Sequence, residues 1–151
     1  MEEKDLKVIE ETLKEILEKL GIEASFKLEE KEGVIFGNLE TKTPGLLIGY
    51  HGKTLSSLQR ILSLIVYHRL NKWPKIILDI GGYRRQREET LKRIALSTAK
   101  KVKFSGQEEE LPPMSSVERR IIHLTLSEDS EVITESKGEG KERRVVIKPS
   151  R

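Results

Sequence analysis

Apolar residues recur first with helical and then with strand periodicity along the first part of the chain. Residues 3–20 place apolar side chains at three-to-four spacing, which predicts an amphipathic helix that ends at Gly21. The extended stretches 22–28 and 34–41, joined by the polar turn 29–33, predict a β-hairpin.

A long helical pattern follows, after a break at Pro44-Gly45, a short apolar segment at 46–48 and the loop Gly49–Gly52. Its apolar residues are expected to form one broad core-facing side: Leu55, Leu58, Ile61, Leu62, Ile65 and Val66. Trp73-Pro74 ends this helix, and residues 75–80 predict a strand. The predicted order is therefore helix, strand, strand, short helix, long helix, strand.

Gly81-Gly82 is the predicted domain boundary, which divides the sequence into residues 1–81 and 82–151. A second long helix follows, and its buried stripe is expected to consist of Leu91, Ile94, Ala95, Thr98 and Val102. Basic residues fall on roughly the opposite side of that helix: Arg85, Lys92, Arg93, Lys100 and Lys103.

The rest of the chain predicts one more helix and a hairpin. Ser115 and Glu118 have the spacing of a capping box, which starts a helix that runs to about Leu126. Stretches 131–137 and 143–148 predict the hairpin. Both halves combine helices with strands, so the fold class is α+β.

Positive charge is concentrated in the middle of the chain. Residues 1–40 have a net charge of −6, residues 41–104 of +11 and residues 105–151 of −2, within an overall net charge of +3. Such a concentration is expected of a surface that meets a polyanion. A solvated basic face has the same appearance, so charge alone leaves the two interpretations level.

The composition argues against several classes of protein. The chain has no cysteine, which excludes disulfides and thiolate metal sites, and its three histidines lie far apart, so no metal or other cofactor is expected. No apolar run approaches the roughly 20 residues that span a bilayer. We therefore expect a cytoplasmic protein without membrane insertion.

The segment GYHGKT at 49–54 ends like a nucleotide-hydrolysing phosphate loop, but that motif needs a glycine where this chain has Leu47. ATP or GTP hydrolysis is therefore disfavoured. The alternative is a Gly-x-x-Gly turn between two helices, whose glycines let a sugar-phosphate chain approach closely. The amides and positive dipole end of the helix that starts near Lys53 would face that chain, and His51 and Lys53 would add donors.

This loop and the element order of the first half resemble the type II KH domain (helix-strand-strand-helix-helix-strand), and LIGYHGKTLSSLQ carries the likeness. The resemblance covers residues 1–81 and implies that Gly49 to Gly52 grip about four unpaired nucleotides. The middle positions are Tyr50 and His51, where KH loops often have Arg or Lys. We therefore expect a weaker attraction to phosphate, with some pH dependence through His51.

The stretches GYRRQREETLKRIA, LPPMSSVERRIIH and TESKGEGKERRVVI resemble the small α+β R-three-H domain, named for an arginine and a histidine. Here the pair is Arg119 and His123, which share one helix face and are implied to hold a phosphate or a stacked base. The alternative is that His123 packs against the hairpin and Arg119 pairs with an acid. Arg120 is expected to be a secondary contact, and Arg85 and Lys92 belong to the basic surface.

A KH domain followed by an R-three-H domain is the arrangement of the bacterial Jag, or SpoIIIJ-associated, family, and the likeness spans nearly the whole chain. It implies single-stranded RNA binding in the cytoplasm and a role as an RNA chaperone or post-transcriptional regulator linked to cell elongation or division. It also implies partnership with a small protein that has a single KH domain. Many members have a further N-terminal domain, whereas this sequence begins at the first KH helix.

The leading hypothesis is a binding module without catalytic residues, which contacts mainly the RNA backbone because aromatic residues are only 5% of the chain. Single-stranded DNA remains an alternative ligand. A nuclease with His51 or His123 as its base is a further alternative, as is a protein-interaction adaptor built on the acidic N-terminal helix. Replacing Gly49 and Gly52 by Asp is expected to remove binding and to leave the fold intact.

Overall fold

The computed structural model describes residues 2–151 and divides the chain into two compact units, with the boundary between Arg84 and Arg85. Helix α4 (Tyr83–Ser105) starts directly after the glycine pair at 81–82, so the boundary falls in its first turn. Each unit has its own hydrophobic core. We describe the two units separately.

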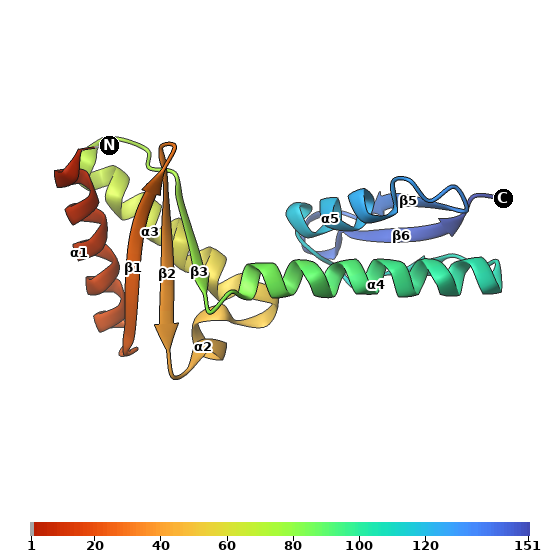
Figure 1. The fold of residues 1–151 in the computed structure, drawn as a ribbon, viewed down its shortest axis with the longest axis horizontal. Helices are drawn as coiled ribbons and strands as arrows, with labels where there is room; N and C mark the ends of the chain where they lie inside the picture. Colours follow the sequence, from red (N-terminus) through yellow and green to blue (C-terminus); the bar gives the residue numbers. More distant parts are fainter. Residues whose placement is uncertain (1) are drawn as a thin grey trace. The chain divides into compact units, whose positions relative to one another are not determined.

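The first unit has the element order predicted for a type II KH domain, which confirms that part of the fold (Figure 1). Its elements are α1 (Glu3–Lys19), β1 (Ala24–Lys31), β2 (Val34–Thr41), α2 (Pro44–Ile48), the 3-10 turn η1 (Tyr50–Gly52), α3 (Lys53–Leu70) and β3 (Ile76–Ile80). The sheet order is β1-β2-β3, with β1 and β2 antiparallel and β2 and β3 parallel. The buried residues of α1 and α3 pack in one cluster with those of β2 and β3, so both helices cover the same face of the sheet.

The turn of the first hairpin is shorter than the sequence predicted. Glu32 and Gly33 alone form it, with φ angles of 51° and 79°, and the strands pair up to Lys31 and Val34. Two residues with positive φ make the type I′ turn that suits the twist of antiparallel strands. The prediction of a turn at 29–33 was wrong because polar residues there belong to a strand with one exposed side.

Helix α3 buries a narrower side than predicted. Its fully buried apolar residues are Leu55, Leu58, Leu62 and Val66. Ile61 is 48% exposed, because it lies about 100° around the helix from Leu62. The inclusion of Ile61 in the core was therefore wrong, and α3 has a second apolar side that faces solvent.

The second unit is a small α+β domain with a three-stranded antiparallel sheet of order β4-β6-β5. After α4 its elements are β4 (Glu109–Glu110), α5 (Ser116–Leu126), β5 (Val132–Lys137), the 3-10 turn η2 (Gly140–Glu142) and β6 (Arg144–Pro149). Leu91, Ala95 and Val102 of α4 are buried as predicted, in one cluster with residues of α5 and of the sheet. Strand β4 was not predicted, because two residues are too few to show the alternation of a strand.

Candidate nucleic-acid interface

The loop between α2 and α3 needs glycine at both of its ends. Gly49 and Gly52 have φ angles of 70° and 77°, which L side chains rarely adopt. A Cβ atom on Gly49 would lie 2.7 Å from Cβ of Thr54, and one on Gly52 would lie 2.9 Å from Cε1 of Tyr83. The expectation that Asp at these positions leaves the fold intact is therefore wrong for the loop itself.

The two middle residues of the loop form a stacked pair of rings. The ring centroids of Tyr50 and His51 lie 3.9 Å apart with an angle of 24° between the ring planes, and Tyr50 is 68% exposed. Nζ of Lys53 lies 5.4 Å from the Tyr50 centroid, within the range of a cation–π contact. The loop thus presents an aromatic surface and a cation together.

Helix α3 begins at this loop without a capping side chain. Its N-cap residue is Gly52, in the left-handed conformation, and the first turn contains no acidic residue. Peptide dipoles therefore give this end a partial positive charge, while the Lys53 amide donates to the Tyr50 carbonyl oxygen within the loop. The 18-residue helix and the exposed Lys53 make the loop an electropositive site.

A network of side chains forms hydrogen bonds with backbone groups of β3 next to this helix. Oε1 of Gln59 accepts hydrogen bonds from the Leu78 amide at 2.9 Å and from Nη2 of Arg84 at 2.8 Å. Nε of Arg84 donates to the Leu78 carbonyl oxygen at 2.7 Å, and Oδ1 of Asp79 accepts from the Arg84 amide at 3.1 Å. Arg84 and Asp79 therefore both have structural roles.

Arg119 and His123 of α5 converge on Ser136 in strand β5. Nη1 of Arg119 donates to Oγ of Ser136 at 3.2 Å, and its Nε donates to the Met114 carbonyl oxygen at 3.3 Å. Nε2 of His123 bonds the same Ser136 hydroxyl at 2.9 Å, while its Nδ1 bonds Oγ1 of Thr134 at 2.7 Å. The structure thus brings the predicted pair together and packs His123 against the hairpin, but Arg119 bonds a hydroxyl and not an acid.

Burial of the imidazole lowers the pKa of His123 from its ordinary value of 6.5, and the charge of Arg119 lowers it further. His123 is therefore neutral at pH 7, with both ring nitrogens engaged by hydroxyls. The predicted pair therefore combines one cationic side chain with a neutral imidazole. Arg119 alone carries the positive charge.

The other predicted basic residues differ in how far acids neutralise them. Arg85 pairs with Glu89 at 3.6 Å, and Lys92 pairs with Glu88 at 3.1 Å, each one helical turn along α4. Lys103, which the helical pattern assigned to the outer face, contacts two acids, Asp129 at 2.6 Å and Glu131 at 3.2 Å.

Arg120 is exposed on α5, and no ion pair within residues 2–151 involves it. It follows Arg119 directly in the helix, so its side chain starts about 100° around α5 from that of Arg119. The charge of Arg120 is thus not neutralised by an acidic side chain within residues 2–151.

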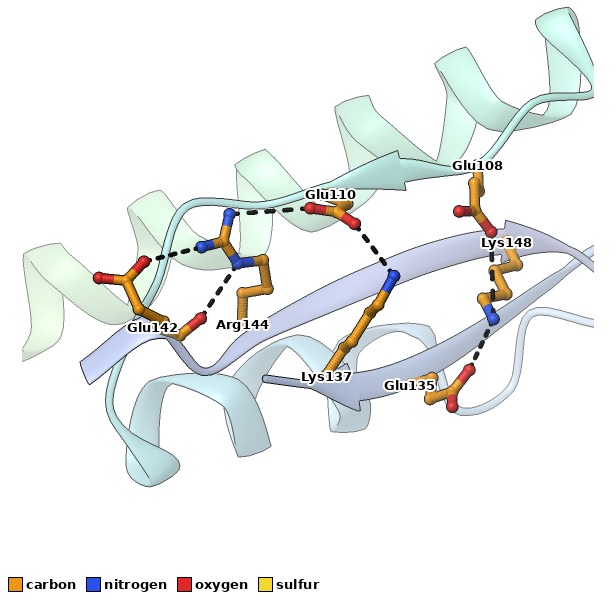
Figure 2. Close-up of polar contacts among 7 residues, drawn as sticks. All are labelled: Glu108, Glu110, Glu135, Lys137, Glu142, Arg144 and Lys148. Carbon is orange, nitrogen blue, oxygen red and sulfur yellow. Dashed lines mark hydrogen bonds and ion pairs between the residues drawn. The ribbon is translucent and has the colours of Figure 1, made fainter. Parts of the chain in front are cut away.

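A network of ion pairs neutralises the charges on the outward face of the second sheet (Figure 2). Arg144 contacts Glu110 and Glu142, and Lys137 also contacts Glu110 at 3.5 Å. Lys148 contacts Glu135 at 2.7 Å and Glu108 at 4.0 Å. These seven residues comprise four acids and three bases, so this face has little attraction for a polyanion. The basic surface of the second unit is therefore not on this side of its sheet.

Sequence reasoning missed Thr134 and Ser136, which bond the candidate pair, and Gln59, which joins α3 to β3 and Arg84. A weak signal existed for the first two, because Val132, Thr134 and Ser136 alternate along one side of the strand and Val132 is buried. Gln59 gave no signal, since its role depends on where β3 lies.

No helix within residues 2–151 is long and apolar enough to cross a membrane. Nowhere in that range do three or more acidic or histidine side chains gather closely enough to hold a metal ion.

Comparison with known families supports the division into two kinds of domain. Residues 7–80 match the family described as KhpA/KhpB, KH domain, and residues 89–149 match the R-three-H domain family. These matches cover most of the chain and agree with the two folds described above.

Three relatives, each named RNA-binding protein KhpB, are similar over most of this chain. The protein from Clostridium symbiosum is 39% identical over 128 residues, which are 85% of this chain and 58% of the relative. The Lactiplantibacillus plantarum protein is 36% identical over 87% of this chain and 41% of the relative. The Bacillus subtilis protein is 31% identical over 92% of this chain and 68% of the relative. The chain thus spans about half the length of the first two relatives.

Proposed function

This chain belongs to the KhpB family, and from that premise we propose that it is a non-catalytic protein that binds single-stranded RNA in the cytoplasm. Its principal contact is the loop Gly49–Gly52 with Lys53. The observation that carries the proposal is the combination of two obligatory glycines with the uncapped, acid-free N-terminus of α3. Such a site attracts phosphate groups and lets the backbone of a strand approach closely.

The second unit supplies a weaker contact through α5 and the outer face of α4. Arg119 and Arg120 provide its charge, and the ion-paired Arg85 and Lys92 add to the positive potential once phosphate displaces Glu89 and Glu88. His123 positions the hairpin and stays neutral. Affinity should therefore fall steeply with salt, because lysine and arginine contacts to phosphate release counterions.

The cellular role that we propose is that of an RNA chaperone or post-transcriptional regulator linked to cell elongation or division. Binding without base-specific hydrogen bonds suits such a role, because one protein can then serve many transcripts. The absence of catalysis is part of this proposal. An RNA that is intact after long incubation with the protein is expected, and rapid cleavage would contradict it.

Lys53→Glu tests the loop as the RNA site. Lys53 is the first residue of α3, where an acidic side chain stabilises a helix, so lost binding would not come from unfolding. We expect the affinity for a labelled unstructured RNA to fall on the order of tenfold, with a shallower salt dependence. Lys4→Glu makes the same charge change in the first turn of α1 and should leave the affinity within about twofold. Equal effects of both variants, or of neither, would overturn the assignment.

DNA of the same sequence, measured in parallel, tests the alternative ligand. Because the loop contacts mainly phosphate, the preference for RNA depends on a group that reads the 2′-hydroxyl. Tighter RNA binding supports the proposal. Tighter binding of DNA would move the function to single-stranded DNA.

The proposed partner is a small protein with a single KH domain. Helix α3 offers a surface for it, since three apolar residues, Ile61, Leu64 and Tyr67, are 40–48% exposed along one side of the helix. Exposed apolar side chains in a row typically mark a site of protein association. This surface is separate from the glycine loop, so partner and RNA can bind together.

A further inference from the structure

The tip of the glycine loop contains the two stacked rings of Tyr50 and His51. A centroid separation of 3.9 Å with an interplanar angle of 24° is the geometry of an offset stack. Tyr50 is 68% exposed, so most of its side chain is accessible to a ligand. No part of the hydrophobic core of the first unit requires the pair, because neither ring belongs to the core cluster.

The backbone of the loop is arranged so that the rings meet. His51 has φ 51° and ψ 32°, a left-handed conformation that is unfavourable for a residue other than glycine. Neighbouring side chains point about 100° apart on a helix and to opposite sides of a strand. Here His51 has the left-handed conformation, and the flanking glycines Gly49 and Gly52 have positive φ angles. This backbone brings the His51 ring alongside that of Tyr50. Strain of this kind is typical of functional sites.

The stack lies beside the groups that would hold a phosphate. Nζ of Lys53 is 5.4 Å from the Tyr50 centroid, and Lys53 is the first residue of α3. A strand whose phosphate meets the amides of that helix therefore has a base within reach of the Tyr50 ring. The cation and the ring can then act on adjacent parts of one nucleotide.

We propose that Tyr50, backed by His51, stacks against one nucleobase of the bound strand, so that the loop holds a base as well as the backbone. This inference rests on the proposed RNA binding and adds a site of stacking to it. Every base has a π-face, so the contact tolerates any sequence but favours the larger purines at that position. The low overall aromatic content concealed it, because two rings are concentrated in one four-residue loop.

A double-mutant cycle between protein and RNA tests the proposal. Tyr50→Ala removes the ring, and Tyr50→Phe keeps it. A set of oligonucleotides carries one abasic nucleotide, moved along the strand. We expect Tyr50→Ala to weaken binding roughly 5- to 150-fold, the range that corresponds to base–aromatic stacking, and Tyr50→Phe to bind within about twofold of the wild type. One abasic position should weaken the wild type similarly, and should cause no further loss in Tyr50→Ala.

Ring-proton chemical shifts supply a readout that a merely structural role would not move. The Tyr50 protons should shift upfield when intact RNA is added, and not when the critical abasic oligonucleotide is added. Additive effects of the ring and of every abasic position would overturn the stacking proposal. So would normal affinity of Tyr50→Ala while Lys53→Glu still weakens binding. If neither the wild type nor any variant binds RNA, the proposed function itself fails.

Discussion

Gly52 and Tyr83 are matched to each other: a Cβ atom on Gly52 would lie 2.9 Å from Cε1 of Tyr83, closer than real Cβ atoms come to their neighbours. Tyr83 packs against the core of the first unit, so its ring cannot simply swing aside. The end of the glycine loop is thereby tied to the first residue of α4. The glycine serves the fold of the loop as well as the approach of a ligand.

Gly52→Ala should therefore destabilise the first unit. The φ angle of 77° is strained for alanine and the contact with Tyr83 adds to it, so we expect the free energy of unfolding to fall by about 1–3 kcal/mol. Trp73 is the only tryptophan of the chain and lies in this unit, so its fluorescence during urea unfolding reports the change. Gly45→Ala is the matched control, since Gly45 is helical and a Cβ there meets nothing within 4 Å. A loss as large in Gly45→Ala, or none in Gly52→Ala, would contradict this reasoning.

A second relationship orients the helices of the second unit. Nε of Arg87 contacts Oε1 of Glu118 at 2.8 Å, with side chains only 16% and 12% exposed. The amide of Glu118 also donates to Oγ of Ser115, as in the predicted capping box, but its carboxylate goes to Arg87 and does not close the box. The ion pair thus joins α4 to the first turn of α5.

Arg87→Ala should cost about 3 kcal/mol of stability, because it leaves the Glu118 carboxylate unpaired in a poorly hydrated place. Arg85→Ala provides the control on the same helix. Its pair with Glu89 spans 3.6 Å with side chains 88% and 63% exposed, so its loss should change stability by at most about 0.5 kcal/mol. The second unit contains no tryptophan, so circular dichroism or amide exchange follows its unfolding. Equal costs for the two variants would show that burial does not distinguish the pairs.

The lowered pKa of His123 predicts a pH dependence of stability. Below pH 6.5 the unfolded chain takes up a proton on His123 that the folded chain still excludes. The contribution of His123 to the free energy of unfolding is therefore fully present above pH 6.5 and is lost as the pH falls below that value. The second unit should therefore be less stable at pH 5.5 than at pH 7.5. His123→Gln should show a smaller difference between these two pH values.

Urea unfolding at both pH values checks this prediction, with the change between them as the measured quantity. Carboxylates such as those of Asp129 and Glu135 have lowered pKa values because lysines pair with them, so they ionise well below this window and do not contribute. An identical pH dependence in the wild type and in His123→Gln would rule out His123 as its source.

The sequence could predict the features that depend on periodicity and on local motifs. The spacing of Leu55, Leu58 and Leu62 located α3, and the motif at Gly49 and Gly52 located the loop at its start. The sequence could not predict that Gly52 and Tyr83 lie close together, because the position of Tyr83 depends on where β3 ends in the folded domain.

The sequence also could not predict the hydrogen-bond partners of the candidate site residues. Ser136 contacts both Arg119 and His123 only because β5 packs beside α5 in one register. A serine in an exposed hairpin has no sequence signature of such a role. The error at Ile61 has the same origin, since a pattern shows that a residue is apolar but not which neighbour covers it.

The exposed apolar side of α3 leads to a last prediction, for the proposed single-KH partner. Leu64 is 43% exposed and Ile61 is 48% exposed, so lysine at either position should be tolerated by the fold. If a partner buries them, each substitution removes roughly half of the about 1.5–3 kcal/mol that full burial of such a side chain provides, and it also places a lysine ammonium in an apolar contact, so the complex should weaken at least about tenfold. Leu20→Lys, at a residue 57% exposed beyond the end of α1, is the control and should leave the complex unchanged.

Titration calorimetry with a purified single-KH protein from the same cell measures the effect, and RNA affinity is measured beside it. Because Ile61 and Leu64 lie outside the glycine loop, their variants should bind RNA as the wild type does. Loss of both activities would indicate misfolding or a shared surface. Unchanged partner affinity in both variants, or concentration-dependent self-association that the same variants abolish, would assign this side of α3 to something other than the proposed partner.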